Sequence, residues 1–263
     1  MSFSVRDAVW DGARYVAVGT SYLPLDGWGM PAAQVSSDGT TWTDLELPPE
    51  LFEAGRDLVS VARGDTRVVI IGNDVVATSD DRVSWQVRPF DHDVSDVEWD
   101  GGRFVTVGPA GAVTSHDGVS WDGPIEIWDP PTTVPFNFSP RIACNREVYV
   151  AAGPNGGLFF SEDAENWSEC TVDVDSPVAD VVWTGNDWVA VTLDARVLVS
   201  VDGMTWTVED VPWEPSPLGT DVSVSNRFRL AAGGDRVIAM ADDLLLVRDC
   251  VPPSPRRSGG RAP

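Results

Sequence analysis

Five short segments of the chain place a serine two residues before an aspartate and end in a tryptophan. They occupy residues 36–42, 79–85, 115–121, 161–167 and 200–206. A serine beside a carboxylate occurs in hydrolases, and His116 adjoins Asp117 in the third segment. No Ser–His–Asp order emerges around that histidine, so the pairs do not predict a catalytic triad. Side chains this close in sequence instead predict hydrogen bonds to the backbone amides of a tight turn.

The five segments recur regularly, with 36 to 46 residues between successive aspartates. Their aspartates and tryptophans are Asp38 and Trp42, Asp81 and Trp85, Asp117 and Trp121, Asp163 and Trp167, and Asp202 and Trp206. Upstream of each lies a hairpin pattern of two β-type runs around a polar turn, as in VWDGARYVAVG at 9–19. Residues 224–234 repeat that pattern once more. Each unit therefore predicts four antiparallel strands, A to D, with the Ser-x-Asp turn between C and D.

Four-stranded units of this length are typical of the blades of a β-propeller. The sequence predicts an all-β, six-bladed propeller over residues 1–249, with blades at about 2–46, 57–88, 94–122, 140–172, 178–210 and 221–249. No strand is spare at the N-terminus, so Leu244–Asp249 should form the outer strand of blade six. Blades one and six should then meet by side-chain packing. Trp10, Trp99 and Trp183 recur near the end of strand A and are expected in the core.

Composition limits the partners, the location and the cysteine chemistry that we expect. The chain has 41 acidic residues, 18 arginines and no lysine, which gives a net charge of -23. This charge disfavours nucleic acid as a partner. The absence of lysine fits either GC-rich coding or a halophilic host. No signal peptide or membrane span is apparent, so cytoplasmic synthesis is expected. Cys144, Cys170 and Cys250 are too few and too scattered for a disulfide framework and are expected as thiols.

Residues 250–263 change in composition to proline, serine, glycine and arginine without an acid. This predicts a flexible tail. The tail is either solvated or engages the acidic body or an acidic partner.

The repeated segments resemble the Asp-box, or bacterial neuraminidase repeat, of sialidase-type propellers, although SSDGTTW is one residue shorter than the usual pattern. The resemblance implies a sialidase-type fold over residues 1–249 without a clear sialidase active site. The combined runs are also similar to propeller modules of phage tail and bacterial surface proteins. This similarity makes a virion, tail or surface assembly the expected setting.

The aspartates of the turns are expected to be structural, with calcium or ligand contact as the alternative. No EF-hand-like spacing supports calcium, and His92 between two acids lacks a second histidine nearby. The sequence predicts no cofactor and no metal site.

Strand direction predicts that A–B and C–D turns share one face, while the long loops at 20–31, 47–57, 122–140 and 210–221 share the other. These loops are rich in aromatic residues outside the repeat pattern: Tyr22, Trp28, Phe52, Trp128, Phe136, Phe138 and Trp213. They either cap the ring or form a contact surface for a protein or a glycan. We expect a non-catalytic binding or structural module that uses this face; its oligomeric state is not predicted.

A glycoside hydrolase using the same face is the alternative. Sialidase-like catalysis implies clustered arginines and a Tyr–Glu pair, and Arg141 and Tyr22 are the candidates nearest that description. Two carboxylates are also required, for which the loop acids are candidates: Asp26, Glu53, Glu126, Asp129 and Glu214. Arginines converging on a central pocket beside a Tyr–Glu pair would favour the enzyme.

Overall fold

The computed structural model describes residues 2–22, 29–52, 57–129, 139–209, 228–233, 236–241 and 244–249. Strands dominate these residues, and α1 (Pro49–Phe52) is the single helix among them. Among the described residues, no helix has the length and apolar character to cross a bilayer.

The strands form six antiparallel sheets, each built in chain order. The first sheet contains β1 (Ser2–Trp10), β2 (Tyr15–Tyr22), β3 (Gly29–Ser36) and β4 (Thr43–Asp44). The second contains β5 (Leu58–Arg63), β6 (Val68–Gly72), β7 (Val75–Ser79) and β8 (Gln86–Pro89). The third contains β9 (Asp96–Trp99), β10 (Phe104–Gly108), β11 (Gly111–Ser115) and β12 (Asp122–Ile125).

The remaining sheets follow the same order. The fourth contains β13 (Arg141–Cys144), β14 (Tyr149–Ala152), β15 (Leu158–Ser161) and β16 (Ser168–Glu169). The fifth contains β17 (Val178–Trp183), β18 (Trp188–Thr192), β19 (Val197–Ser200) and β20 (Thr207–Glu209). The sixth has three described strands, β21 (Arg229–Gly233), β22 (Arg236–Ala241) and β23 (Leu244–Asp249).

Second strands are the most apolar part of the sheets. β6, β10, β14 and β18 are buried along their whole length. Apolar runs of this kind suit a strand that is covered on both faces. Hydrophobic clusters fill the space between consecutive sheets: one contains Val16 of the first sheet and Ile70 of the second, and another contains Ala152 of the fourth and Leu198 of the fifth. The sheets therefore pack face to face in chain order.

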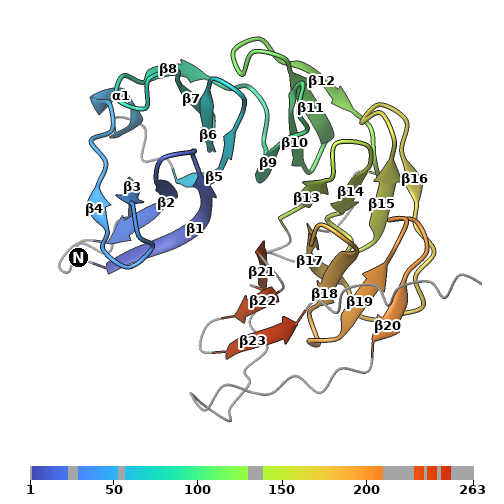
Figure 1. The fold of residues 1–263 in the computed structure, drawn as a ribbon. Coiled ribbons are helices and arrows are strands. Elements are labelled where there is room, and N and C mark those ends of the chain that lie inside the picture. Colours follow the sequence, from blue (N-terminus) through green and yellow to red (C-terminus); the bar gives the residue numbers. More distant parts are fainter. Residues whose placement is uncertain are drawn as a thin grey trace, which may run out of the picture.

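The first strand of every sheet lies innermost. β1, β5, β9, β13, β17 and β21 each contact the next in the series, and Figure 1 shows the sheets following one another around a common axis. Arg14 Nη2, in the first hairpin turn, donates to the carbonyl of Arg82 in the next Ser-x-Asp turn at 2.7 Å. Hairpin turns and Ser-x-Asp turns thus share one face, as strand direction predicts.

The sixth sheet departs from its predicted register. The sequence aligns residues 224–234 with a complete first hairpin, but their described part forms one strand, β21, in the innermost place. Leu244–Asp249, predicted as the outer strand of this blade, is the outermost of its three described strands. The backbone N–H of Leu230 donates to Asp180 Oδ2 at 2.9 Å, and this contact holds β21 beside β17. Residues 221–227 lie outside the described residues.

The first sheet is uncovered on the face that points away from the second. Trp10 is 44 % exposed and Tyr15 39 %, whereas Trp99 and Trp183 pack onto hydrophobic clusters. The expectation that Trp10 is a core residue is wrong, because no described sheet packs on its side of β1. The packing expected between the first and sixth sheets is not seen among the described residues.

Two predicted loops contain regular structure. β12 occupies the start of the expected loop at 122–140, where Thr114 pairs with Asp122 and Ala112 with Ile125. α1 occupies part of the expected loop at 47–57 and buries Leu51.

Candidate functional site

All five Ser-x-Asp turns use the same hydrogen bonds. In the first, Ser36 Oγ accepts the N–H of Gly39 at 2.8 Å. Asp38 Oδ1 accepts the N–H groups of Thr40 and Thr41 at 2.8 and 2.7 Å. The other four turns repeat both contacts. The amides of Thr41 and Thr40 hold the pKa of Asp38 far below its usual range. The turn itself therefore occupies the carboxylate, which accounts for an aspartate at this position.

The tryptophans that end these turns pack against the preceding sheet where one exists. Those of the second to fifth sheets join the hydrophobic clusters at these boundaries: Trp85, Trp121, Trp167 and Trp206. Trp42 of the first sheet is exposed, and its ring lies 6.4 Å from that of Tyr15.

Hairpin turns of the first three sheets bind the Ser-x-Asp turn of the next sheet. Arg82 Nη2 donates to the carbonyl of Asp11 at 2.9 Å, reciprocating the bond from Arg14. Arg67 likewise donates to the carbonyl of Asp117, and Arg103 to that of Asp163. These contacts join sheets one to two, two to three and three to four along the same face.

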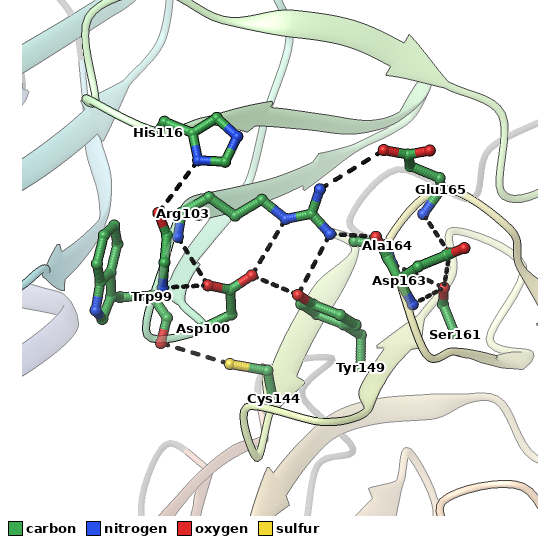
Figure 2. Close-up of polar contacts among 11 residues, drawn as sticks. Trp99, Asp100, Arg103, His116, Cys144, Tyr149, Ser161, Asp163, Ala164 and Glu165 are labelled. Carbon is green, nitrogen blue, oxygen red and sulfur yellow. Dashed lines mark hydrogen bonds and ion pairs between the residues drawn. The ribbon is translucent and has the colours of Figure 1, made fainter.

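The third of these connections contains residue types that catalytic sites use (Figure 2). Tyr149 donates its hydroxyl proton to Asp100 Oδ2, which also lies 3.2 Å from Arg103 Nε. Glu165 Oε1 lies 3.8 Å from Arg103 Nη1, and His116 Nδ1 lies 3.3 Å from the carbonyl of Gly102. Burial and the bond to Asp100 raise the pKa of Tyr149 to about 12. The cluster joins sheets three and four, since Asp100 and Arg103 come from the third sheet and Tyr149 and Glu165 from the fourth.

A second polar cluster lies on the axis. A cavity of about 390 Å³, here called the axial cavity, is lined by residues from all six innermost strands. Strand register places one residue of each sheet at the same level, and we call this set the axial ring. The axial ring consists of Asp7, Ser60, Asp96, Arg141, Asp180 and Arg229.

Acids of the axial ring bind the backbone of the following sheet. Asp7 Oδ2 accepts the N–H of Val61 at 2.9 Å, and Asp96 Oδ2 accepts that of Ile142 at 3.0 Å. Asp180 binds Leu230 in the same way. Each carboxylate therefore ties two neighbouring inner strands together.

Ser60 links two of these acids. Its Oγ lies 2.6 Å from Asp7 Oδ2 and 2.9 Å from Asp96 Oδ1. One hydroxyl proton cannot serve both contacts at once, so the two carboxylates share a single donor. Burial and the nearby Asp96 raise the pKa of Asp7 to about 6, so Asp7 takes up a proton only as the pH falls through about 6.

The basic members occupy the other half of the axial ring. Arg141 is buried and lies 3.5 Å from Asp96 Oδ1, and its Nε has no hydrogen-bond partner among the residues that the structure describes. Burial and the charge of Arg141 lower the pKa of Arg229 to about 10. Glu98 lies one level further along β9 and lines the same cavity. Burial, Asp96 and Asp7 raise the pKa of Glu98 well above its ordinary value.

The aromatic residues expected on the long-loop face are placed as follows. Tyr22 ends β2 and Phe52 ends α1, and both are partly exposed. Trp128 is only 7 % exposed, because its ring packs on Phe159 and its Nε1 donates to the carbonyl of Pro109 at 3.0 Å. We therefore remove Trp128 from the predicted contact surface. The others lie outside the described residues: Trp28, Phe136, Phe138 and Trp213.

Phe52 borders a groove of about 370 Å³ on the uncovered face of the first sheet. We call it the first-sheet groove; its apolar lining is Phe3, Met30, Leu45, Leu47 and Phe52. Asp44 and Gln34 stand at the same groove and are hydrogen-bonded to each other at 2.9 Å.

The described residues contain no group of three or more His, Cys, Asp or Glu side chains placed to hold a metal ion. Cys144 and Cys170 are free thiols, and Cys250 lies outside the described residues. Of the loop acids considered for catalysis, Glu126 and Asp129 are exposed, while Asp26, Glu53 and Glu214 lie outside the described residues.

Sequence reasoning missed the axial ring. Three of its members, Asp7, Asp96 and Asp180, stand three residues before the recurring Trp10, Trp99 and Trp183. That spacing was the available signal. The other members differ in type, so a search for identical residues passes over them.

No family model matches the chain, and no curated protein matches it. Solved structures do resemble it. YCF48 from Cyanidioschyzon merolae superposes with a TM-score of 0.61 at 12 % identity, covering 93 % of this chain and 95 % of that one. YCF48 bound to D1 peptide gives a TM-score of 0.55 at 13 % identity, covering 95 % and 94 %. The Neurospora crassa Pan2 WD40 domain gives 0.58 at 9 % identity, covering 92 % and 74 %.

These neighbours are β-propellers, and the likeness extends over nearly the whole chain. Together with the antiparallel sheets around an axial cavity, they show that the chain has a β-propeller fold. At these identities the likeness establishes the fold alone.

Proposed function

We propose that this chain is a non-catalytic propeller module that binds a partner protein, and that the first-sheet groove takes an apolar segment of that partner. One observation carries the proposal: Met30 and Phe52 remain 37 % and 39 % exposed beside an apolar groove of about 370 Å³. Exposed apolar surface of this kind is typical of interaction sites. YCF48, which shares the fold, has been captured with a bound peptide.

Charge suggests the character of the partner segment. The chain has a net charge of -23, and Asp44 stands at the groove itself. An apolar segment flanked by basic residues fits both features, because opposite charge speeds encounter and excludes wrong partners. We propose a multiprotein assembly as the setting, with the virion or tail suggested by the repeats as one such assembly.

The test is binding of the purified full chain to an array of short apolar peptides with basic flanks. Phe52→Asp and Met30→Asp should each weaken the best peptides at least tenfold, because either places a charge in the groove. The matched control is Val201→Asp, which alters an apolar residue, 85 % exposed, in the Ser-x-Asp turn of the fifth sheet. Equal losses in all three variants, or none in the groove variants, would refute the proposal. Signals on a parallel glycan array that depend on Phe52 would assign the groove to a carbohydrate instead.

A glycoside hydrolase is the second candidate, and one observation favours it: Arg141, Arg229 and Glu98 all line the axial cavity. The required tyrosine is missing, since Tyr15, Tyr22 and Tyr149 are the three tyrosines of the chain and none lines that cavity. Hydrolysis of fluorogenic sialosides or glucosides that disappears in Glu98→Gln would establish the enzyme.

A further inference from the structure

The charged side chains that line the axial cavity balance one another, unlike those of the whole chain. The chain has 41 acidic residues and 18 arginines, whereas the described residues that line the cavity include four arginines and four acids. The cavity volume of about 390 Å³ lies in the lower part of the range for ligand sites, roughly 300 to 1,000 Å³. The cavity therefore suits a small molecule that carries no net charge.

Glu98 is the one charged residue at its level of the cavity in the described part of the chain. Two residues beyond the axial ring, strand register places apolar residues in the other five sheets: Val9, Ala62, Ala143, Val182 and Ala231. Apart from burial, the largest effects on the carboxyl of Glu98 are repulsions from Asp96 and Asp7. A cationic group of a ligand beside Glu98 would relieve them, and an ionisable group perturbed in this way within a cavity is a candidate for ligand contact.

Arg141, on the neighbouring inner strand β13, has donor groups left over. Its side chain is buried, and Nη1 lies 3.5 Å from Asp96 Oδ1 and donates to the carbonyl of Ser95 at 3.3 Å. Its Nε is buried without a hydrogen-bond partner among the described residues. A guanidinium binds a carboxylate through two parallel N–H groups, and Nε with Nη2 is such a pair. Burial and the charge of Arg141 lower the pKa of Arg229 to about 10, so a carboxylate placed here would also reduce the repulsion between these two arginines.

The levels of Glu98 and Arg141 are two residues apart on the same side of the inner strands, which corresponds to about 7 Å along a strand. Two amino-acid residues in extended conformation also span about 7 Å. We propose that the axial cavity binds a dipeptide with apolar side chains, whose ammonium group contacts Glu98 and whose carboxylate contacts Arg141. The apolar residues at the level of Glu98 accommodate its side chains. This site is separate from the first-sheet groove, since no described residue lines both.

The test is calorimetric titration of the purified full chain with leucyl-leucine and with the smaller alanyl-alanine. The tighter of the two is then compared with its N-acetyl form and its C-terminal amide. The free dipeptide should bind at least tenfold more tightly than either blocked form, because each blocked form leaves one charged group of the cavity without its partner. It should also bind at least tenfold more tightly than the corresponding free amino acid, which is too short to reach both groups.

Glu98→Gln tests the ammonium contact, because glutamine keeps the shape of the side chain and removes its charge. This variant should bind the dipeptide at least tenfold more weakly and lose the preference over the N-acetyl form, while the preference over the amide persists. Arg141→Lys should reduce the preference over the amide severalfold and leave the other intact. The Glu98→Gln result decides the proposal even where Arg141→Lys does not fold.

The matched control is Glu162→Gln, which alters an exposed glutamate in the Ser-x-Asp turn of the fourth sheet. It should leave the affinity for the dipeptide unchanged, and so should Phe52→Asp in the first-sheet groove. A loss of binding in Phe52→Asp with none in Glu98→Gln would place the dipeptide in that groove and overturn the proposal.

Four other results would overturn it: no saturable binding of either dipeptide, equal binding of the free and blocked forms, equal losses in Glu98→Gln and Glu162→Gln, or equal binding of the free amino acid. Sialic acid carries a carboxylate without an ammonium group and serves as the last probe. Its binding in preference to the dipeptide, unaffected by Glu98→Gln, would assign the cavity to a carboxylate alone.

Discussion

Tyr149→Phe offers the sharpest test of how neighbouring sheets are joined. The substitution deletes one oxygen from a ring that is 5 % exposed, so it leaves almost no cavity. The lost hydroxyl donates to Asp100 Oδ2 and lies 3.4 Å from Arg103 Nη2. Hydrogen bonds to charged groups contribute about 1.5 to 3 kcal/mol. Asp100 keeps its bonds from the amides of Gly102 and Arg103, so we expect a loss of about 2 kcal/mol in the free energy of unfolding.

The repeat provides a matched control. Tyr15 begins the second strand of the first sheet, as Tyr149 does in the fourth, but it is exposed. Tyr15→Phe should therefore change stability by less than about 0.5 kcal/mol. The assay is urea unfolding followed by tryptophan fluorescence, with free energies compared at a constant m-value.

Asp100→Asn completes a double-mutant cycle. Its coupling with Tyr149→Phe should exceed about 1 kcal/mol, because the two groups share one bond. Burial raises the pKa of Asp100, but the hydrogen bonds from Tyr149 and from the amides outweigh burial and lower this pKa below 3.8. The ionised Asp100 therefore stabilises the fold above pH 3.8, and this stabilisation is lost only as the pH falls below that value. The cost of Tyr149→Phe should accordingly stay constant between about pH 5 and 8. Equal costs for Tyr149→Phe and Tyr15→Phe would refute the reasoning.

Three further outcomes are expected. Glu98→Gln should raise the free energy of unfolding increasingly as the pH rises above 4.5. The raised pKa of Glu98 means that the wild-type fold loses stability as this carboxyl ionises, and glutamine does not ionise. A stabilisation that does not depend on pH, measured by urea unfolding, would contradict this. Gly203→Ala should lower the free energy of unfolding by at least about 1 kcal/mol more than Gly39→Ala. Both glycines have a positive φ, but only at Gly203 would the new Cβ lie 3.0 Å from Val150. Equal melting temperatures of the two variants would show that this crowding has no effect. In a Cys250→Ser background, Cys144 should resist iodoacetamide at pH 8 until the chain is unfolded, because burial and the charge of Glu98 raise its pKa to about 12; rapid labelling of the native chain, read by mass spectrometry, would contradict that burial.

The repeated turns made most of the fold predictable. The serine and aspartate of each Ser-x-Asp turn bind the same backbone amides in all five copies. The five copies therefore occupy equivalent positions in five sheets. Strand direction then decides which turns share a face, and the bond from Arg14 to Arg82 agrees with it.

The failures have identifiable physical causes. Residues 229–233 resemble the second strands of the other units in composition. Their position as the innermost strand accompanies the hydrogen bond from Leu230 to Asp180, a residue far away in the sequence. Trp10 matches Trp99 in pattern, yet burial depends on a covering sheet that a single unit does not encode. Trp128 is buried by Phe159, a contact between the end of one unit and the middle of the next. The axial ring was missed because its members share a position while differing in chemistry.

Contacts between hairpin turns and Ser-x-Asp turns link each of the first three sheets to the sheet that follows it in the chain. Arg14, Arg67 and Arg103 bind a turn made later in synthesis, and Arg82 returns the first of these contacts to Asp11. In a nascent chain, each of sheets two to four would therefore meet a sheet that has already been synthesised and can bind it. If the sheets fold one after another in this order, the first sheet is the one whose outer face has no earlier sheet to pack against.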